Sequence, residues 1–560
     1  MSRHDSLAYL CRAPRISAAA IKECATIVSH PPELRSIPAL LALHAQTRGS
    51  HVFLLDERGA LTYAQAHAEA AVVGSMLTQL GVERGAHVAL MLPNRREFVL
   101  SWFGIAMIGA VEVPVSPGNS AERLIHILNH SRCRVLVVQA ADLGQLINTA
   151  ELRHLEHVVV VDELPVGIPT GLPFELHEWA SALAGATTAS LWATGLDVAM
   201  WDQAAVMYTS GSTGPAKGAM LSHGHHYMNG YQAAVSAGIT GQDVIYVAMP
   251  LHHNMAQGYG VMPALVVGAT VRMAVRFDRE EFWADVNGSG ATILPFVGAM
   301  LVLLAKNPDA PDDADNTLRV GFGVPIPAGI KRPFEKRFGL RLLSCYGSTE
   351  ASIVAWNTDQ DDDSNAVGRI FPGYEVRVVD GNDLPVAAGA RGEICVRADE
   401  PYAMFSGYLD DPAKTAQATR NLWFHTGDRG WFDEQGRLWF SDRMGDVIRC
   451  KGENISAYEI EQVLTSHFAV SLVAAYGVPS ELGDEEIAVA VIPRAGHDLT
   501  AAELSRWSGA HMPKYMRPRY IDLVDELPLT PTGKVEKYRL RGRGIPTTAF
   551  DALHPQGPTN

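Results

Sequence analysis

The feature that most constrains the fold is a repeated alternation of amphipathic helical segments with short apolar runs. Between residues 37 and 115, helix-like periodicity at 66–80 is followed by an apolar run at 87–92, a second helical segment at 97–108 and another apolar run at 111–115. Such alternation is typical of a parallel sheet whose faces are covered by helices. It returns in later apolar runs, at 135–139, 157–161, 243–249, 270–273 and 292–295. The sequence therefore predicts a large α/β fold, with room for an internal duplication.

The pattern changes in the last third of the chain. Between Glu375 and Arg397, short β-like runs alternate with turn sequences, which predicts a small antiparallel sheet or β-barrel-like unit. A mixed segment follows after Arg443, with helical patterns at 456–466 and 501–512 and strand patterns at 470–476 and 487–492. We therefore expect a large domain over 1–442, a smaller α+β domain ending near 545, and a disordered tail at 546–560.

Charge, cysteine usage and hydropathy exclude several classes of protein. The 560 residues include 46 basic and 61 acidic side chains, a net charge of −15, which argues against a nucleic-acid partner. The 6 cysteines are scattered without metal-ligand spacing, so neither a disulfide framework nor a zinc site of cysteines is predicted. No apolar stretch reaches the roughly 18 residues that span a bilayer, and the N-terminus lacks a secretion signal, so we expect a cytoplasmic protein without membrane contact.

A segment rich in glycine and hydroxyl side chains follows the apolar run 204–207. Glycines let backbone N–H groups turn toward an anion, hydroxyls add donors, and Lys217 adds charge, so the segment suits a phosphate. It does not match the usual P-loop spacing, and composition alone leaves a flexible loop as an equal alternative. The candidate phosphate-binding residues are Thr209, Ser210, Gly211, Ser212, Thr213, Gly214 and Lys217.

This segment resembles the phosphate loop of the acyl-adenylate-forming superfamily, which includes acyl-CoA synthetases, luciferases and peptide-synthetase adenylation domains. Further motifs similar to those of the superfamily follow in order, from about Ser36 to Arg541. Within it, the chain most resembles the crotonobetaine/carnitine and medium-chain acyl-CoA ligases. The resemblance implies that 1–442 is an adenylation domain with ATP and acyl sites, 443–446 a hinge, and 447–545 a mobile C-terminal domain.

Three motifs resemble the nucleotide site of that superfamily. In 346–350, the resemblance assigns Tyr346 to adenine, Thr349 to the phosphate, and Glu350 to Mg²⁺, which prefers carboxylate and phosphate oxygens. Gly347 belongs to the same nucleotide-binding motif. A loop with helix-capping side chains is the alternative interpretation. In 321–325, the adenine-binding turn would include Gly323, Val324 and Pro325, with Val324 where a smaller alanine is usual. In 425–428, Asp428 would bind the ribose hydroxyls, although such a sequence alone is more often a turn.

The remaining motifs resemble the hinge and the C-terminal domain. Arg443 would give a second contact to ribose or phosphate, and Gly445 stands at the hinge where aspartate or lysine is usual. Glycine can absorb a hinge rotation but lacks a side chain to fix one orientation, which leaves the balance of the two half-reactions open. Gly452 and Glu453 would line the thiol tunnel, and Lys534 would bridge the carboxylate and the α-phosphate.

The acyl site is expected around the segment 250–254, in which His253 resembles a gating residue. A lone histidine is more often structural, so this role depends on the order of motifs. The segment offers no carboxylate for an α-ammonium group, which argues against an amino acid substrate. The residues that the resemblance places around the acyl group are mostly apolar and predict a hydrophobic acid: Met255, Gly258, Phe296, Val297, Met300, Phe322 and Ala351.

Together these motifs predict an AMP-forming acyl-CoA synthetase that uses ATP, Mg²⁺ and coenzyme A, with Lys534, Glu350, Lys217 and His253 as its catalytic residues. Two alternatives within the superfamily are an enzyme that only thioesterifies a supplied acyl-adenylate and one whose acceptor is a carrier-protein phosphopantetheine. A non-catalytic nucleotide- or acyl-binding regulator is a third. The expected partners are the acid and coenzyme A, with a homodimer as one possible assembly.

Overall fold

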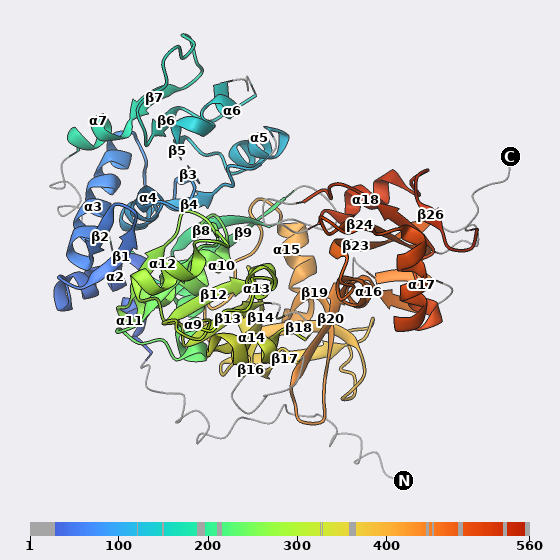
Figure 1. The fold of residues 1–560 in the computed structure, drawn as a ribbon. Coiled ribbons are helices and arrows are strands. Elements are labelled where there is room, and N and C mark those ends of the chain that lie inside the picture. The colour runs from blue at the N-terminus through green and yellow to red at the C-terminus, as the bar shows by residue number, and fades with distance from the viewer. Residues whose placement is uncertain are drawn as a thin grey trace. The chain divides into compact units, whose positions relative to one another are not determined.

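The computed structural model describes residues 29–119, 121–147, 151–186, 197–209, 216–324, 326, 329–357, 366–443, 447–450, 453–479, 485–529 and 535–554 (Figure 1). The described residues form two compact units. The first comprises 29–209, 216–376 and 396–424, and the second comprises 377–395 and 425–554.

The first unit contains a seven-stranded sheet of order β7-β6-β5-β3-β4-β8-β9. All neighbouring strands from β7 to β8 are parallel, and β9 closes one edge as an antiparallel strand. The apolar runs predicted at 87–92, 111–115, 135–139 and 157–161 are strands of this sheet. Its strands are β3 (His87–Met91), β4 (Val111–Pro114), β5 (Val135–Val138), β6 (His157–Val160), β7 (Glu175–Glu178), β8 (Gln203–Thr209) and β9 (Lys217–Ser222).

The first unit also contains a nine-stranded sheet of order β16-β15-β14-β13-β12-β10-β11-β1-β2. Its middle, from β14 to β1, is parallel, and antiparallel strands close both edges. The repeated alternation is therefore divided between two sheets. In both, the helical segments supply the long crossover connections that parallel strand pairs need. The strands are β1 (Val52–Asp56), β2 (Gly59–Thr62), β10 (Val244–Val247), β11 (Thr270–Met273), β12 (Ile293–Val297), β13 (Val320–Val324), β14 (Arg341–Ser348), β15 (Ser352–Trp356) and β16 (Arg369–Ile370).

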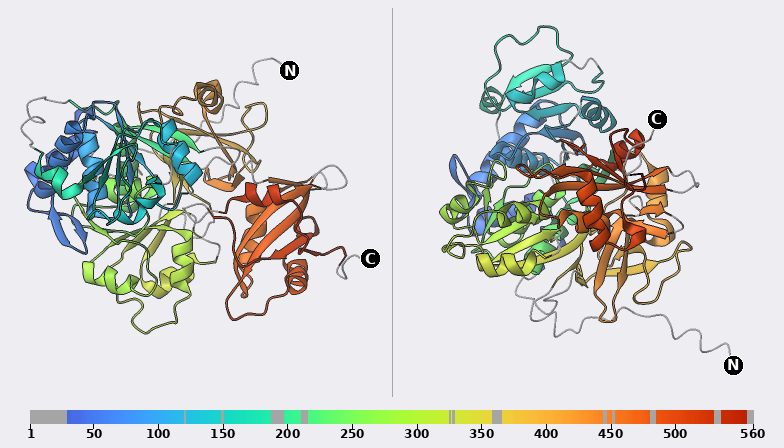
Figure 2. Two further views of the ribbon diagram at one scale, coloured as in Figure 1. Left: turned by 90° about the horizontal axis from the view of Figure 1, so that it is seen from above. Right: turned by 45° about the vertical axis from the view of Figure 1, so that its right-hand side comes forward.

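Helices connect and cover these strands (Figures 1 and 2). The helix α3 begins with a capping box between Thr62 and Gln65, and α9 begins where the Ser222 hydroxyl accepts from the His225 amide. Almost every residue of α9 is buried, because the helix packs against strands of both sheets. The helices are η2 (Pro32–Leu34), α2 (Ile37–Thr47), α3 (Tyr63–Gln79), α4 (Arg96–Met107), α5 (Ala121–His130), η3 (Ala140–Asp142), α6 (Gly144–Ile147), α7 (Trp179–Ala184), α9 (His223–Ala237), α10 (Asn254–Ala256), η4 (Gln257–Val261), α11 (Met262–Val267), α12 (Phe282–Ser289), α13 (Gly298–Ala305), α14 (Lys331–Phe338), α15 (Pro412–Ala418) and η5 (Arg420–Leu422).

The small β unit predicted around 375–397 is a four-stranded sheet of order β17-β18-β19-β20. Its strands are β17 (Tyr374–Val379), β18 (Gly392–Ala398), β19 (Phe424–Phe432) and β20 (Leu438–Arg443). Strands β19 and β20 are antiparallel, with Asp428 opposite Arg443.

The rest of the second unit is the predicted α+β segment. A second four-stranded sheet, β23-β24-β25-β26, carries its helices, and the helical patterns at 456–466 and 501–512 are helices. Its elements are β21 (Val447–Cys450), β22 (Glu453–Ser456), α16 (Ala457–Thr465), β23 (Val470–Pro479), β24 (Glu485–Pro493), α17 (Ala501–His511), η7 (Lys514–Met516), β25 (Tyr520–Leu523), α18 (Lys537–Arg543) and β26 (Phe550–Asp551).

The chain after residue 546 differs from the predicted disordered tail. Phe550 and Asp551 form β26, which pairs with β25, and the Phe550 ring packs on the apolar core of this unit. Arg519 also forms an ion pair with Asp551 at 3.3 Å. Strand pairing, an aromatic contact and an ion pair therefore order a segment that has no apolar periodicity. Residues 555–560 lie outside the described part.

Across the described ranges, the structure contains no helix with both the length and the apolar character needed to cross a bilayer. The cytoplasmic location stays a prediction.

Candidate active site

The candidate phosphate loop connects two antiparallel strands. Thr209 ends β8, Lys217 begins β9, and the two residues lie directly opposite each other in the ladder. The His126 ring donates from Nε2 to the carbonyl oxygen of Ala216 at 3.1 Å, so α5 holds the end of the loop. The predicted phosphate contacts Ser210, Gly211, Ser212, Thr213 and Gly214 lie outside the described residues.

Lys217 and Glu350 are brought together by a tyrosine that sequence reasoning missed. The Tyr408 hydroxyl donates to Glu350 Oε1 at 3.1 Å, and the Lys217 Nζ atom lies 5.4 Å from the centre of the Tyr408 ring. The segment of Tyr408 runs beside β9, where the Leu409 amide donates to the Gly218 carbonyl oxygen at 2.8 Å. The Phe405 amide also donates to the Glu350 carbonyl oxygen at 2.8 Å. A cation, an aromatic ring and a carboxylate therefore form one cluster, and we call these three residues the Lys217 cluster.

The Lys217 cluster suits a magnesium-bound phosphate on chemical grounds. Carboxylate oxygen is a ligand that Mg²⁺ prefers, and an ammonium group beside it can balance phosphate charge. The tyrosine hydroxyl fixes the orientation of the carboxylate through a hydrogen bond to a charged acceptor, which is among the stronger kinds. The donor set of this cluster thus fits the predicted ion.

Tyr346 and Gly347 lie near the end of β14, and Thr349 and Glu350 lie in the turn between β14 and β15. Tyr346 is buried, and Gly347 lies opposite Ile353 in the antiparallel ladder. A Cβ atom on Gly347 would overlap the carbonyl oxygen of Ser352, so only glycine allows the two strands to approach this closely. The tight turn therefore presents Thr349 and Glu350 at the end of β14.

The predicted adenine-binding turn lies at the end of β13, in the middle of the nine-stranded sheet. Gly323 lies opposite Phe296 of β12, and Val324 lies opposite Val297. A Cβ atom on Gly323 would overlap the carbonyl oxygen of Phe296. The glycine at this position is therefore required by strand packing, whatever its nucleotide role. Pro325 lies outside the described residues.

A buried asparagine that the sequence did not reveal holds the segment before His253. The Asn94 side-chain amide donates to the carbonyl oxygens of Met249 and Ala274, and its Oδ1 accepts from the Leu251 amide at 2.8 Å. Asn94 is 3% exposed, so these bonds replace all contact with water. His253 is the N-terminal cap residue of α10. The segment that leads to His253 is therefore held by one residue, Asn94, which lies 155 positions before Met249 and 157 before Leu251.

The residues predicted around the acyl group occupy β12, β13, α13 and the α10–η4 segment. Phe296, Met300, Phe322 and Ala351 are buried, whereas Val297 is 36% exposed. Met255 is partly buried, and Gly258 is buried beside Asn229. The Phe322 ring lies 5.6 Å from that of Tyr259. These residues are mostly apolar, but the neighbouring amide of Asn229 introduces a polar group that the sequence pattern did not indicate.

The buried carboxyl group of Glu112 contacts the α10–η4 segment through Gln257. Gln257 donates to Glu112 Oε1 at 2.9 Å and to the Leu251 carbonyl oxygen at 2.9 Å. Burial raises the pKa of Glu112 well above its usual range, and the hydrogen bond from Gln257 offsets only part of that effect. Through Gln257, this buried carboxyl group is linked to the backbone of Leu251 in the segment before His253.

In the second unit, Asp428 lies on β19 directly opposite Arg443 of β20. The Asp428 amide donates to the Thr426 hydroxyl at 3.1 Å, and Gly427 has a φ of +72° that favours glycine. The preceding His425 lies 2.9 Å from Glu393 and 3.3 Å from the Cys395 sulfur. These contacts fix the turn that presents Asp428, so the predicted ribose residue lies on a well-supported strand.

Several predicted residues of the second unit cannot be placed. Gly445, Gly452 and Lys534 lie outside the described residues. Glu453 begins β22, opposite Cys450 of β21. Leu529 and Val535 pair across the segment that carries Lys534. The roles of these residues stay predictions.

Comparisons with known proteins agree with this fold. The family described as AMP-binding enzyme matches residues 41–409, and the one described as AMP-binding enzyme C-terminal domain matches residues 459–534. The chain is 31% identical over 488 residues to the crotonobetaine/carnitine–CoA ligase of Salmonella paratyphi A, across 86% of this chain and 93% of that protein.

Solved structures of similar fold include two ligases. The anthranilate CoA ligase AuaEII in complex with anthranoyl-AMP matches with a TM-score of 0.80 and 23% identity, over 91% of this chain and 97% of that one. A benzoate CoA ligase from Burkholderia xenovorans LB400 matches with a TM-score of 0.79 and 24% identity, over 90% and 99% of the two chains. The chain therefore belongs to the AMP-binding enzyme family, the acyl-adenylate-forming superfamily that its motifs resemble, in the branch of the acyl-CoA ligases.

Proposed function

We propose that this AMP-forming acid–thiol ligase activates a hydrophobic carboxylic acid with ATP and Mg²⁺ as an acyl-adenylate and transfers the acyl group to coenzyme A. The observation that carries the proposal is the Lys217 cluster, in which Tyr408 joins the lysine beside the candidate phosphate loop to the carboxylate of Glu350. These two residues come from motifs that are over one hundred positions apart, and the fold places them around one tyrosine.

The chemistry requires a better leaving group than the acid provides. A carboxylate oxygen attacks the α-phosphorus of ATP, the bond from that phosphorus to the bridging oxygen breaks, and pyrophosphate leaves. Lys217 and Lys534 would stabilise the negative charge on the phosphate, and backbone amides of the candidate loop would add donors. Mg²⁺, held by Glu350 and phosphate oxygens, would neutralise the charge of the leaving pyrophosphate.

A rotation of the C-terminal domain would then withdraw Lys534 from the acyl-adenylate. The same rotation would bring the face that carries Gly452 and Glu453 to the active site. We propose 1–442 as the adenylation domain, 443–446 as the hinge with Gly445, and 447–545 as the mobile domain. The thiol sulfur of coenzyme A attacks the acyl carbon, and AMP leaves with the electron pair of the broken bond. Asp428 and Arg443 lie on paired strands next to the hinge, which suits a nucleotide contact near the moving part.

The proposed substrate is an apolar acid. Phe296, Met300, Phe322 and Ala351 are buried apolar side chains on the elements that the resemblance assigns to the acyl group. The amide of Asn229, which lies against Gly258, offers a polar contact to a substituent on that acid. The crotonobetaine/carnitine–CoA ligases and the benzoate and anthranilate CoA ligases define the first acids to test.

The test is acid-dependent release of pyrophosphate from ATP, measured with and without coenzyme A across a panel of carboxylic acids. We expect release that requires one class of acid, thioester formation when coenzyme A is present, and loss of release in Lys534→Ala. Lys514→Ala is the matched control, because it removes an exposed lysine from the same unit and should leave release unchanged.

Other outcomes identify the alternatives. No release from any acid, with rapid thioester formation from a supplied acyl-adenylate, would identify an enzyme of the second half-reaction only. Thioester formation with a carrier-protein phosphopantetheine but not with coenzyme A would identify the carrier protein as the acceptor. ATP binding without turnover of any acid would refute the proposal and favour a regulator.

A further inference from the structure

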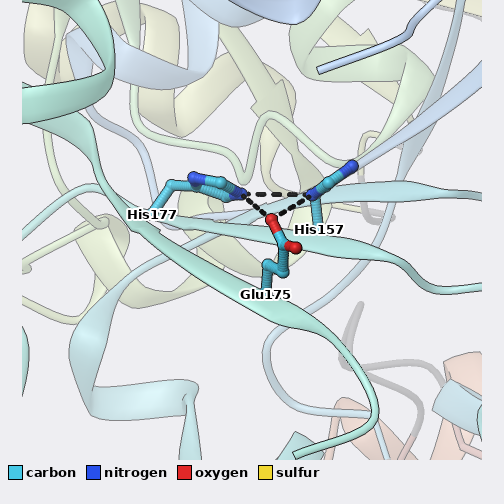
Figure 3. Close-up of side chains that lie close together, drawn as sticks. All are labelled: His157, Glu175 and His177. Carbon is cyan, nitrogen blue, oxygen red and sulfur yellow. Dashed lines mark hydrogen bonds and ion pairs between the residues drawn. The ribbon is translucent and has the colours of Figure 1, made fainter.

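A group of metal-ligating side chains lies at the outer edge of the seven-stranded sheet, on strands that carry none of the motifs described above. Figure 3 shows His157, Glu175 and His177 with their ligand atoms directed toward one another. His157 begins β6, and Glu175 begins β7, the edge strand, directly opposite it. His177 follows Glu175 by two positions and therefore projects from the same face of the strand. The register of one parallel strand pair thus creates the group.

The distances within this group match the size of a metal ion. His157 Nδ1 lies 3.1 Å from His177 Nε2 and 3.6 Å from Glu175 Oε2, and His177 Nε2 lies 3.8 Å from the same oxygen. A circle through these three atoms has a radius of about 2.0 Å. An ion near its centre would therefore lie at about the 2.0–2.2 Å that zinc keeps from imidazole nitrogen and carboxylate oxygen.

Hydrogen bonding alone does not explain the arrangement. The 3.1 Å contact between the two imidazoles is within the range of an N–H···N bond. The carboxylate oxygen lies 3.6 and 3.8 Å from the two nitrogens, which is beyond that range. A bound cation would account for all three separations, because each atom would then bond the ion and not its neighbours.

The chemistry of the group selects the class of ion. Two imidazoles and one carboxylate suit Zn²⁺, Co²⁺ and Ni²⁺, whereas Mg²⁺ and Ca²⁺ prefer oxygen ligands only. The side chains of His157 and His177 are 20% and 24% exposed, and that of Glu175 is 75% exposed, so an ion can enter from solvent. Water would complete the coordination on the open side, as in zinc sites with three protein ligands.

We propose that His157, Glu175 and His177 bind one divalent transition-metal ion of the zinc class, which ties the edge strand β7 to β6. β7 pairs with β6 through four residue pairs, and no strand of the described ranges pairs with its other side. Because β6 and β7 are joined by a connection from 161 to 174, a metal that links them closes a loop and stabilises this edge. The ion acts on the stability of the sheet and takes no part in acid activation.

The test uses the full-length chain after removal of metals with a chelator. Zn²⁺ is titrated by calorimetry in the presence of excess Mg²⁺, which occupies oxygen-rich sites, and Co²⁺ is titrated by its visible absorbance. We expect one equivalent to bind with a Kd in the micromolar range or below, and the melting temperature to rise with added Zn²⁺. His177→Asn should abolish both effects, and Glu175→Gln should weaken binding at least about tenfold.

His154→Ala is the matched control, because it removes an exposed histidine from the segment just before β6. It should bind Zn²⁺ like the natural protein. Glu175→Gln changes a mostly exposed side chain, so its metal-free melting temperature should be unchanged, which separates loss of binding from loss of folding. Failure of the natural protein to bind stoichiometric Zn²⁺ or Co²⁺ would overturn the proposal. So would equal binding by the double variant His157→Asn/His177→Asn.

Discussion

The buried histidines of α9 should make the first unit sensitive to mild acid. His223, His225 and His226 are all fully buried. Burial lowers the pKa of His223 and of His225 to about 4, and burial together with the neighbouring histidines lowers the pKa of His226 well below its ordinary value. In the unfolded chain the same rings titrate near pH 6.5. Protons therefore bind the unfolded chain more readily, and stability is lost as the pH falls from about 6.5 toward 4.

The expected size of this effect follows from those pKa values. At pH 5.5, protonation stabilises each of the three histidines in the unfolded chain by about 1.4 kcal/mol relative to pH 7.5. The three together lower the free energy of unfolding by about 4 kcal/mol, a large share of the roughly 5–15 kcal/mol typical of native proteins. Urea unfolding followed by tryptophan fluorescence reports on this region, because Trp102 is buried with its ring 5.7 Å from that of His226.

His226→Phe tests the contribution of one ring. Neither ring nitrogen of His226 has a hydrogen-bond partner among the described residues, so phenylalanine keeps the shape without leaving a lost bond. The difference in unfolding free energy between pH 7.5 and 5.5 should decrease by about 1.4 kcal/mol in this variant. His154→Ala, which removes an exposed histidine, should keep most of the pH dependence of the natural protein. An equal pH dependence in His226→Phe and the natural protein would refute the reasoning.

Three further substitutions test the candidate active site. Tyr408→Phe removes the hydrogen bond to the Glu350 carboxylate, and a hydrogen bond to a charged group contributes about 1.5–3 kcal/mol. We therefore expect kcat/KM to fall about 10- to 100-fold, and the Mg²⁺ concentration needed for half-maximal pyrophosphate release to rise. Gly323→Ala places a Cβ atom on a neighbouring carbonyl oxygen, so calorimetry should show a loss of at least about 2 kcal/mol of stability. Asn94→Ala removes three buried hydrogen bonds that hold the segment before His253, so we expect a loss of about 3 kcal/mol in urea unfolding and a higher KM for the acid.

The first two of these substitutions have a control in the same unit. Tyr402→Phe changes a tyrosine that is 44% exposed and should leave the Mg²⁺ requirement unchanged. Gly288→Ala adds a methyl group to open space in α12 and should be neutral or stabilising by up to about 1 kcal/mol. Full activity in Tyr408→Phe, native stability in Gly323→Ala, or an unchanged KM in Asn94→Ala would contradict the role given to that residue.

Local sequence determined the elements and the family. The apolar runs at 87–92 and 111–115 became strands, and the helical patterns at 456–466 and 501–512 became helices, because the period of apolar residues is set by the geometry of each element alone. The short motifs around Tyr346 and Thr209 identified the family for a related reason. A tight turn or a phosphate loop requires particular residues at consecutive positions, so it can be recognised from one short segment of the sequence.

Tertiary structure alone decided which distant residues meet. Tyr408 reaches Glu350 across 58 positions and Asn94 holds Leu251 across 157, and neither residue stands in a motif of its own. Glu175 and His177 are two positions apart, but His157 is distant in the chain, and only the register of β6 against β7 brings it to them. The sequence by itself thus determined the kinds of element and the family. Contacts between segments depend on the global packing of sheets and helices, which no local period or spacing encodes.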